Sequence, residues 1–205
     1  MKISLINAII FDFGGVFVNW DPHHLYNKYF GNDAHAIDAF LAEIQFASWN
    51  LHQDQGRPFA LGVKELSARF PQYEHLIRAY DEEWEQSIID TIPGTVEKLE
   101  RLKSAGYHLY GLTNWSAEKF HNIRGKYRVF DFFEDIVVSG EVNLIKPDPA
   151  IFNLLLERIH RQPYECLLVD DSQHNLEIAK TMGFSTIHFT SPNQLESELQ
   201  RIGVL

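Results

Sequence analysis

Five short apolar runs spread along the chain each stop at a polar or glycine residue, and this pattern constrains the fold most. The runs cover residues 8–11, 107–112, 136–138, 166–169 and 185–189. Continuous apolar runs of this length are typical of strands that are covered on both faces. Stretches of helical periodicity separate several of them, over residues 94–105, 149–161 and 175–182. The alternation of strand and helix predicts an α/β fold with a doubly wound parallel sheet.

One long segment, residues 17–92, shows helical periodicity and no convincing buried strand. Asp21 followed by Pro22 is typical of a helix N-cap with proline at the first helical position, and it predicts a helix through Tyr29. Three more helices are expected over residues 33–49, 59–70 and 73–88. We therefore predict an α/β core made of residues 1–16 and 93–205, with residues 17–92 inserted as a four-helix cap domain.

Composition narrows the choice of partners and compartment. With 18 basic and 28 acidic residues, the net charge of −10 argues against a nucleic-acid-binding surface. No apolar run approaches the roughly 20 residues of a membrane span, and no small-residue cleavage site follows the first 13 residues. The single cysteine, Cys166, favours a reducing compartment. We expect a soluble, cytoplasmic monomer or homodimer with no nucleic-acid or membrane partner.

Polar side chains gather where the predicted strands end. They are Asp12, Thr113, Asn114, Asp170 and Asp171, with Lys146 in the loop after the strand at 136–138. Ligands of open parallel sheets bind at this carboxyl edge. Three adjacent carboxylates repel one another unless a cation lies among them, and oxygen ligands suit Mg²⁺. A cation and a lysine together attract a phosphoryl group, which Asp12 could attack as a carboxylate nucleophile.

These strand ends belong to four short motifs that stand in order along the chain. They are Phe11-Asp12-Phe13-Gly14-Gly15-Val16, Leu112-Thr113-Asn114, Lys146-Pro147-Asp148-Pro149 and Leu168-Val169-Asp170-Asp171 with Asn175. Over essentially the whole chain they resemble the haloacid dehalogenase superfamily, in the branch with a helical cap after the first motif. The resemblance implies a Rossmann-like core and a Mg²⁺-dependent hydrolase that acts on a small phosphorylated metabolite.

The resemblance also implies a role for each motif residue. Asp12 would become a phospho-aspartyl intermediate, Thr113 and Asn114 would hold the phosphoryl group, and Lys146 would neutralise charge. The Mg²⁺ ligands would be Asp12, the Gly14 carbonyl and Asp171, with Asp170 binding directly or through water. The predicted catalytic residues are thus Asp12, Thr113 and Lys146, and the predicted substrate contacts are Thr113, Asn114, Trp115 and Lys146.

Gly14 departs from the usual pattern of these phosphatases, most of which carry a second aspartate two residues after the nucleophile. That aspartate protonates the leaving group, and a positioned acid contributes roughly 10²–10⁴-fold in rate. The first motif resembles bacterial glucose-1-phosphate phosphatases, which share the glycine, and it is also similar to the phosphatase domain of soluble epoxide hydrolases. Our hypothesis is that the substrate is a hemiacetal phosphate with a good leaving group, or that Asp21, His23 or His24 of the cap supplies the proton.

Two tryptophans, Trp20 and Trp115, flank the first and second motifs, where they could stack on the face of a sugar. Because the first motif resembles that of sugar phosphatases, the resemblance implies a sugar phosphate as the favoured substrate.

Two alternatives remain. A metal-independent L-2-haloacid dehalogenase also uses an aspartate nucleophile and the lysine, but it lacks paired carboxylates such as Asp170 and Asp171. The arginine that clamps its substrate has no counterpart in residues 19–22. The second alternative is a weakly active family member that binds a phosphorylated ligand or a regulatory partner, and Gly14 is its one support.

Overall fold

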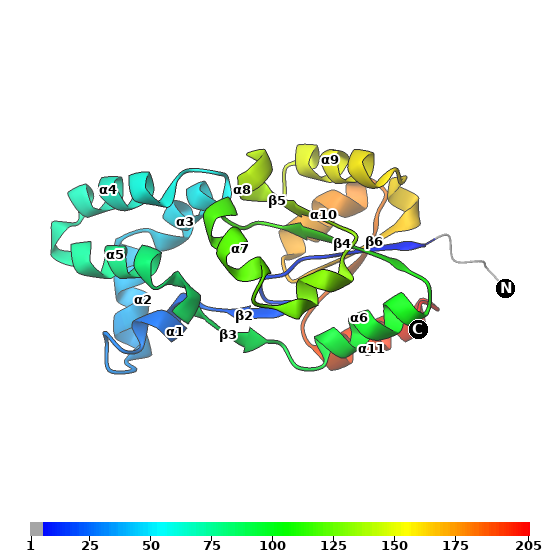
Figure 1. The fold of residues 1–205 in the computed structure, drawn as a ribbon, viewed down its shortest axis with the longest axis horizontal. Coiled ribbons are helices and arrows are strands. Elements are labelled where there is room, and N and C mark those ends of the chain that lie inside the picture. The colour runs from blue at the N-terminus through cyan, green and yellow to red at the C-terminus, as the bar shows by residue number, and fades with distance from the viewer. Residues whose placement is uncertain (1–5) are drawn as a thin grey trace.

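The computed structural model describes residues 6–205, and its core is a five-stranded parallel sheet in the order β5-β4-β1-β6-β7 (Figure 1). The strands are β1 (Ala8–Phe11), β4 (His108–Thr113), β5 (Asp135–Val138), β6 (Cys166–Asp170) and β7 (Ser185–His188). Each neighbouring pair of strands is parallel. All five predicted strands are present, which confirms the α/β fold with a parallel sheet.

The central strand β1 shows why the apolar runs are continuous rather than alternating. Ile9 and Phe11 join one hydrophobic cluster, while Ala8 and Ile10 join a second cluster on the opposite face. Successive strand residues point to opposite faces, so a sheet covered by helices on both sides needs apolar residues at every position. All four residues are fully buried.

Helices cover both faces of the sheet (Figure 1). The first cluster is completed by α6 (Thr95–Ser104), α7 (Ala117–Arg124) and α11 (Pro192–Arg201). The second is completed by α9 (Pro149–Ile159) and α10 (Gln173–Thr181). A short helix, α8 (Ser139–Val142), follows β5 directly. The start of α9 is fixed by sequence, because Asp148 caps it by accepting a 2.8 Å hydrogen bond from the Ala150 N–H.

The inserted segment forms a helical cap that extends to one side of the core, at the left of Figure 1. Its helices are α1 (Pro22–Tyr26), α2 (Ala34–Glu43), α3 (Phe46–Asp54), α4 (Phe59–Arg69) and α5 (Glu74–Glu82). Five helices replace the predicted four, because the helix expected over residues 33–49 breaks at Gln45. This residue has a left-handed φ of 55° and separates α2 from α3.

Residues 17–92, where sequence showed helical periodicity and no convincing buried strand, also contain two short strands that are only partly buried. Strands β2 (Val18–Trp20) and β3 (Ile88–Thr91) form a two-stranded antiparallel sheet at the two ends of the segment. They are short and far apart in sequence, so neither gives a periodic signal of its own. The exact limits of core (1–16 and 93–205) and cap (17–92) stay a prediction, and residues 1–5, part of the stretch searched for a signal peptide, lie outside the described residues.

Aromatic side chains hold the cap together around Tyr80, which is fully buried. The rings of Phe46 and Phe59 lie 4.8 and 6.1 Å from its ring, centroid to centroid, and Tyr26 stacks on it at 6.4 Å. Such contacts stabilise a small helical unit beyond the area that they bury. Tyr80 thereby fixes α5 against α1, α3 and α4.

Two further predictions concern the setting of the protein. Within residues 6–205 no helix combines the length and the apolar character that crossing a membrane requires. Cys166 is a free cysteine buried in β6. The cytoplasmic location and the monomeric or homodimeric state stay predictions.

Candidate active site

Three carboxylates meet at the carboxyl edge of the sheet, as the strand ends predicted. Strands β1 and β6 are paired in register, with Phe11 opposite Val169, so Asp12 and Asp170 follow side by side. One oxygen each from Asp12, Asp170 and Asp171 lies within 4.8 Å of the others. These atoms and the Lys146 ammonium form what we call the carboxylate cluster.

Lys146 reaches the cluster from the loop after α8. Its Nζ lies 3.1 Å from Asp12 Oδ1 and 2.7 Å from Asp170 Oδ2, and its side chain is buried. The lysine is held in place by Asn114, whose amide donates to the Lys146 carbonyl at 2.9 Å and accepts from the Lys146 N–H at 2.8 Å. The side-chain amide of Asn114 is therefore engaged in positioning Lys146.

The protonation of the cluster reflects an excess of negative charge. Burial raises the pKa of Asp12 to about 7 against the lowering effect of Lys146, and Asp170 and Asp171 add to the rise. The pKa of Asp171 is raised as well, by partial burial and by Asp170. Burial lowers the pKa of Lys146, but the charges of Asp12 and Asp170 outweigh it and raise the pKa above its ordinary value. One ammonium thus faces three carboxylates.

This donor set fits a divalent cation. Carboxylate oxygens are the protein ligands that Mg²⁺ prefers, and a dication would oppose both the burial and the mutual repulsion that raise the pKa values of Asp12 and Asp171. Asp170 accepts the most hydrogen bonds of the three carboxylates. Its donors are Lys146 Nζ, the Ser172 N–H at 2.8 Å and Asn175 Nδ2 at 3.1 and 3.2 Å. Asp12 and Asp171 keep more oxygen capacity for a metal.

The two glycines after Asp12 differ in what they allow. Gly15 has a φ of +73°, and a Cβ there would overlap the carboxylate of Asp171, so a side chain at this position would displace a cluster residue. A Cβ on Gly14 would meet no other atom within 4 Å, and the φ of Gly14 is ordinary. The second glycine is therefore a steric requirement of the cluster, whereas Gly14 leaves open space beside Asp12.

Thr113 lies at the end of β4, next to β1 in the sheet. It is buried, and its hydroxyl has no hydrogen-bond partner among the described residues. An unpaired buried hydroxyl is costly unless something else satisfies it. This hydroxyl is therefore available to an oxygen of a bound group, and the role of Thr113 in holding a phosphoryl group stays a prediction.

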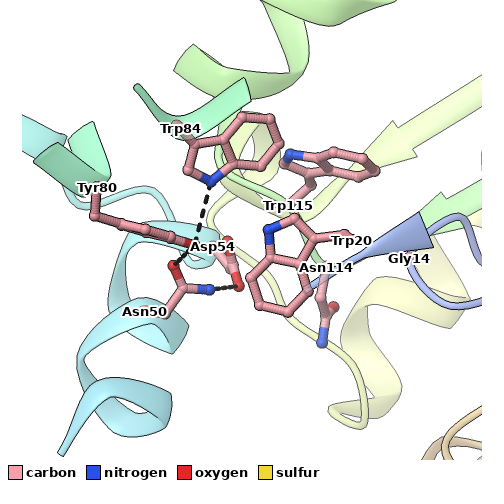
Figure 2. A pocket seen from close by; sticks show the side chains of 8 residues that line it. All are labelled: Gly14, Trp20, Asn50, Asp54, Tyr80, Trp84, Asn114 and Trp115. Carbon is pink, nitrogen blue, oxygen red and sulfur yellow. Dashed lines mark hydrogen bonds between the residues drawn. The ribbon is translucent and has the colours of Figure 1, made fainter. Parts of the chain in front are cut away.

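A cavity of about 100 Å³ is lined by Gly14, which stands two residues after Asp12, and by Asn114, which follows Thr113 (Figure 2). We call it the leaving-group cavity. Its lining residues come from both core and cap and are Gly14, Trp20, Asn50, Asp54, Tyr80, Trp84, Asn114 and Trp115. Both tryptophans singled out from sequence line it, and the indole N–H groups of Trp20 and Trp115 have no partner within residues 6–205.

The three cap residues suggested as proton donors do not line this cavity. The His23 ring lies 2.7 Å from Asp21 and 3.0 Å from Asp38, on the side of the cap where α1 meets α2. His24 is partly buried and also lies outside the cavity lining. The structure therefore places none of Asp21, His23 and His24 in the lining of this cavity.

Four cap residues of the cavity were missed from sequence, and hydrogen bonds join them into one chain (Figure 2). Trp84 Nε1 donates to the Tyr80 hydroxyl at 3.2 Å, which donates to Asn50 Oδ1 at 3.1 Å, and Asn50 Nδ2 donates to Asp54 Oδ2 at 2.9 Å. A sequence signal is the spacing of four residues, which puts Asn50 and Asp54 on one face of α3, while Trp84 follows the end of α5. This spacing does not say which faces meet.

Comparisons with known proteins agree with this geometry. The model of the family described as haloacid dehalogenase-like hydrolase matches residues 9–189. One curated relative is a sesquiterpene phosphatase, astK, of Aspergillus oryzae, which is 26% identical over 97% of both chains. A phosphorylated carbohydrates phosphatase of Thermotoga maritima is 23% identical over 89% of this chain and 84% of the relative. The (S)-2-haloacid dehalogenase 4A of Burkholderia cepacia is 27% identical over 70% of this chain and 59% of the relative.

Among solved structures, a HAD family enzyme of Bacteroides thetaiotaomicron in complex with magnesium and inorganic phosphate superposes with a TM-score of 0.68. It is 25% identical to this chain and the match covers 91% of this chain and 95% of that one. The predictions of a Rossmann-like core with a helical cap and of a hydrolytic enzyme are confirmed. The chain belongs to the haloacid dehalogenase-like hydrolase family.

Proposed function

We propose that this protein is a Mg²⁺-dependent phosphomonoester hydrolase that works through a phospho-aspartyl intermediate on Asp12. The observation that carries the proposal is the carboxylate cluster, in which three carboxylate oxygens lie within 4.8 Å of one another and Lys146 contacts two of the groups. Asp12, Asp171 and the Gly14 carbonyl would hold the ion, with Asp170 binding directly or through water. Bound Mg²⁺ would neutralise charge on the carboxylates and on the phosphate.

The residues of the chain divide the remaining work. A carboxylate oxygen of Asp12 attacks phosphorus, and the Phe13 N–H orients this side chain by donating to Asp12 Oδ1 at 2.7 Å. Lys146 faces the same carboxylate and stabilises negative charge as the phosphoryl group is transferred. The free hydroxyl of Thr113 binds a phosphoryl oxygen. Asn114 keeps Lys146 in position.

We propose a small phosphorylated metabolite as the substrate, with a sugar phosphate favoured. The leaving-group cavity of about 100 Å³ suits a small leaving group rather than a long one. Its aromatic walls offer stacking surfaces, and the indole N–H groups of Trp20 and Trp115 are donors for hydroxyl oxygens. The relative from Thermotoga maritima, a phosphatase of phosphorylated carbohydrates, supports this choice.

A 2-haloacid dehalogenase is the second candidate, because one curated relative has that activity. A 2-haloacid carries a carboxylate that must be neutralised. None of the residues that line the leaving-group cavity is an arginine or a lysine, so the cavity offers no cation to neutralise such a substrate. This charge pattern favours the phosphatase.

The test is a screen of sugar phosphates, nucleotides, organic acid phosphates and a 2-haloacid, each with Mg²⁺ and with EDTA. We expect phosphate release from at least one ester, dependent on Mg²⁺ and abolished by EDTA. Halide release that persists in EDTA, without phosphate release, would establish the dehalogenase instead.

A further inference from the structure

Breaking a P–O ester bond leaves an alkoxide unless a nearby acid supplies a proton, and Gly14 cannot do so. Among the side chains that line the leaving-group cavity, Asp54 bears the one carboxyl group. Resting on the proposed function, we propose that Asp54 of cap helix α3 protonates the leaving-group oxygen and then deprotonates the water that hydrolyses phospho-Asp12. A cap residue would thus supply the general acid and base that the core lacks at Gly14.

The position of Asp54 suits this role. It stands at the end of α3, and Figure 2 shows it among the lining side chains, hydrogen bonded to Asn50. Gly14, which stands two residues after Asp12, lines the same cavity. The charge of Asp12 also contributes to the pKa of Asp54, so the two carboxyl groups lie near enough to interact electrostatically. A phosphate ester attacked by Asp12 would extend its leaving group towards Asp54.

Although Asp54 belongs to the cap, the core holds it in place. The Ser139 hydroxyl of α8 donates to the Asp54 carbonyl, while it accepts from the Trp115 N–H at 2.8 Å. The backbone N–H of Ser116 hydrogen-bonds the Asp54 carboxylate. Two residues further, a side chain on Gly56 would overlap Asn143, so the end of α3 fits closely against the segment after α8. A general acid needs such fixed placement.

The chemistry of the carboxyl group is that of an acid near neutral pH. Burial raises the pKa of Asp54 to about 8, against the hydrogen bond from Ser116, and the charge of Asp12 raises it further. The competing hydroxyl of Tyr80 is engaged between Trp84 and Asn50, and burial holds its pKa well above the ordinary value. Of these two cavity residues, Asp54 is the stronger acid and therefore the better proton donor.

Atoms and electrons balance over the two steps. An Asp12 oxygen forms a bond to phosphorus, the bond from phosphorus to the leaving oxygen breaks, and that oxygen takes its electron pair and the proton of Asp54. A water oxygen then bonds to phosphorus while its proton passes to the Asp54 carboxylate. The bond from phosphorus to Asp12 breaks, which returns Asp12 ionised and Asp54 protonated. The net reaction consumes one ester and one water and yields the alcohol and phosphate.

The test compares the dependence of kcat/KM on leaving-group pKa in the wild type and in Asp54→Asn, from p-nitrophenyl phosphate through phenyl phosphate to an alkyl phosphate. The wild type should show a shallow dependence. Asp54→Asn should lose roughly 10²–10⁴-fold on the alkyl phosphate and far less on p-nitrophenyl phosphate, which needs no acid. With p-nitrophenyl phosphate it should also give a burst of nitrophenolate, because loss of the base slows hydrolysis of phospho-Asp12.

Matched variants make the result decisive. Asp38→Asn changes an exposed cap carboxyl outside the cavity and should keep the wild-type slope. The double variant Asp54→Asn/Gly14→Asp should regain a shallow slope, because position 14 has room for a side chain beside Asp12. Melting curves of each variant establish that it is folded.

Other outcomes separate this inference from the proposed function. An unchanged slope in Asp54→Asn, with or without a higher KM, would overturn the acid role and leave Asp54 as a leaving-group contact. In that case loss of activity in Asp12→Asn would still support the phosphatase. Full activity of Asp12→Asn would instead contradict the proposed function itself.

Discussion

The two halves of the candidate site, carboxylate cluster and leaving-group cavity, are built by different means. The cluster carries three carboxylates and an ammonium on and near the ends of adjacent strands. The cap side of the cavity carries aromatic and amide groups with one carboxyl, all from the helices and strand β2 of the insertion. Charge is thus concentrated where the phosphoryl group would be transferred, and the cavity for the leaving group is nearly neutral.

The halves also differ in what holds them. Register between β1 and β6 places Asp12 beside Asp170 without help from the cap. The cap side depends on contacts between distant residues, such as Ser139 with Asp54 and the Phe59 N–H with Glu118 at 3.2 Å. We therefore expect substitutions in the core half to lower the catalytic rate. Substitutions in the cap half should instead change substrate specificity and the dependence of the rate on leaving-group pKa.

The largest expected effect is at the nucleophile. Asp12→Asn keeps the shape of the side chain and removes the attacking oxygen, so phosphatase turnover should fall on the order of 10⁶-fold, as for other enzymes that lose their nucleophile. Phosphate release in a steady-state assay measures it, with melting curves to establish folding. Residual activity within tenfold of wild type would mean that the core half does not carry the chemistry.

Lys146→Met should come next, with kcat lowered roughly 10²–10³-fold, because the lost ammonium no longer offsets charge on Asp12 and the phosphate. Lys126→Met, which changes an exposed lysine paired with Glu85, is the control and should leave kcat unchanged. Equal effects of the two variants would contradict a role for Lys146 in the transfer.

A third prediction separates the adjacent glycines. Gly15→Ala should lower the free energy of unfolding by about 1–3 kcal/mol, because alanine is strained at a φ of +73° and its Cβ overlaps Asp171. Gly14→Ala should change it by less than about 0.5 kcal/mol. Denaturant unfolding measures both. A large loss in Gly14→Ala would show that the space beside Asp12 is not free.

The smallest expected effect is on stability against pH, and it comes from the cap. The pKa of Asp54 is about 8 in the folded protein and 3.8 ordinarily, so between these values the folded state binds the extra proton and stability falls as pH rises. The variant Asp54→Asn should not lose stability in this way as pH rises. Its melting temperature relative to wild type, both free of metal, should therefore rise steadily from pH 5 to pH 8. Parallel curves would mean that Asp54 titrates normally.

Much of the core could be predicted from sequence. Each apolar run became a strand of the sheet, and parallel strands bring their carboxyl ends to one edge whatever the loops between them do. The meeting of Asp12 with Asp170 and Asp171 followed from that geometry alone. The strands β2 and β3 were missed because they are only three and four residues long and pair with each other across the whole length of the cap segment.

The cap side was decided by tertiary structure. The sequence suggested Asp21, His23 and His24 as proton donors because they follow the first motif closely, yet closeness along the chain does not place them in the cavity. Asp54 is 42 positions from Asp12 and reaches the cavity through the break at Gln45 and the docking of α3 on α8. Helical periodicity shows which face of a helix is buried and leaves open what that face meets. By itself the sequence determined the sheet and the residues at its edge, because each strand and its polar end are marked locally. Only the packing of the cap helices selected the carboxyl group that faces that edge.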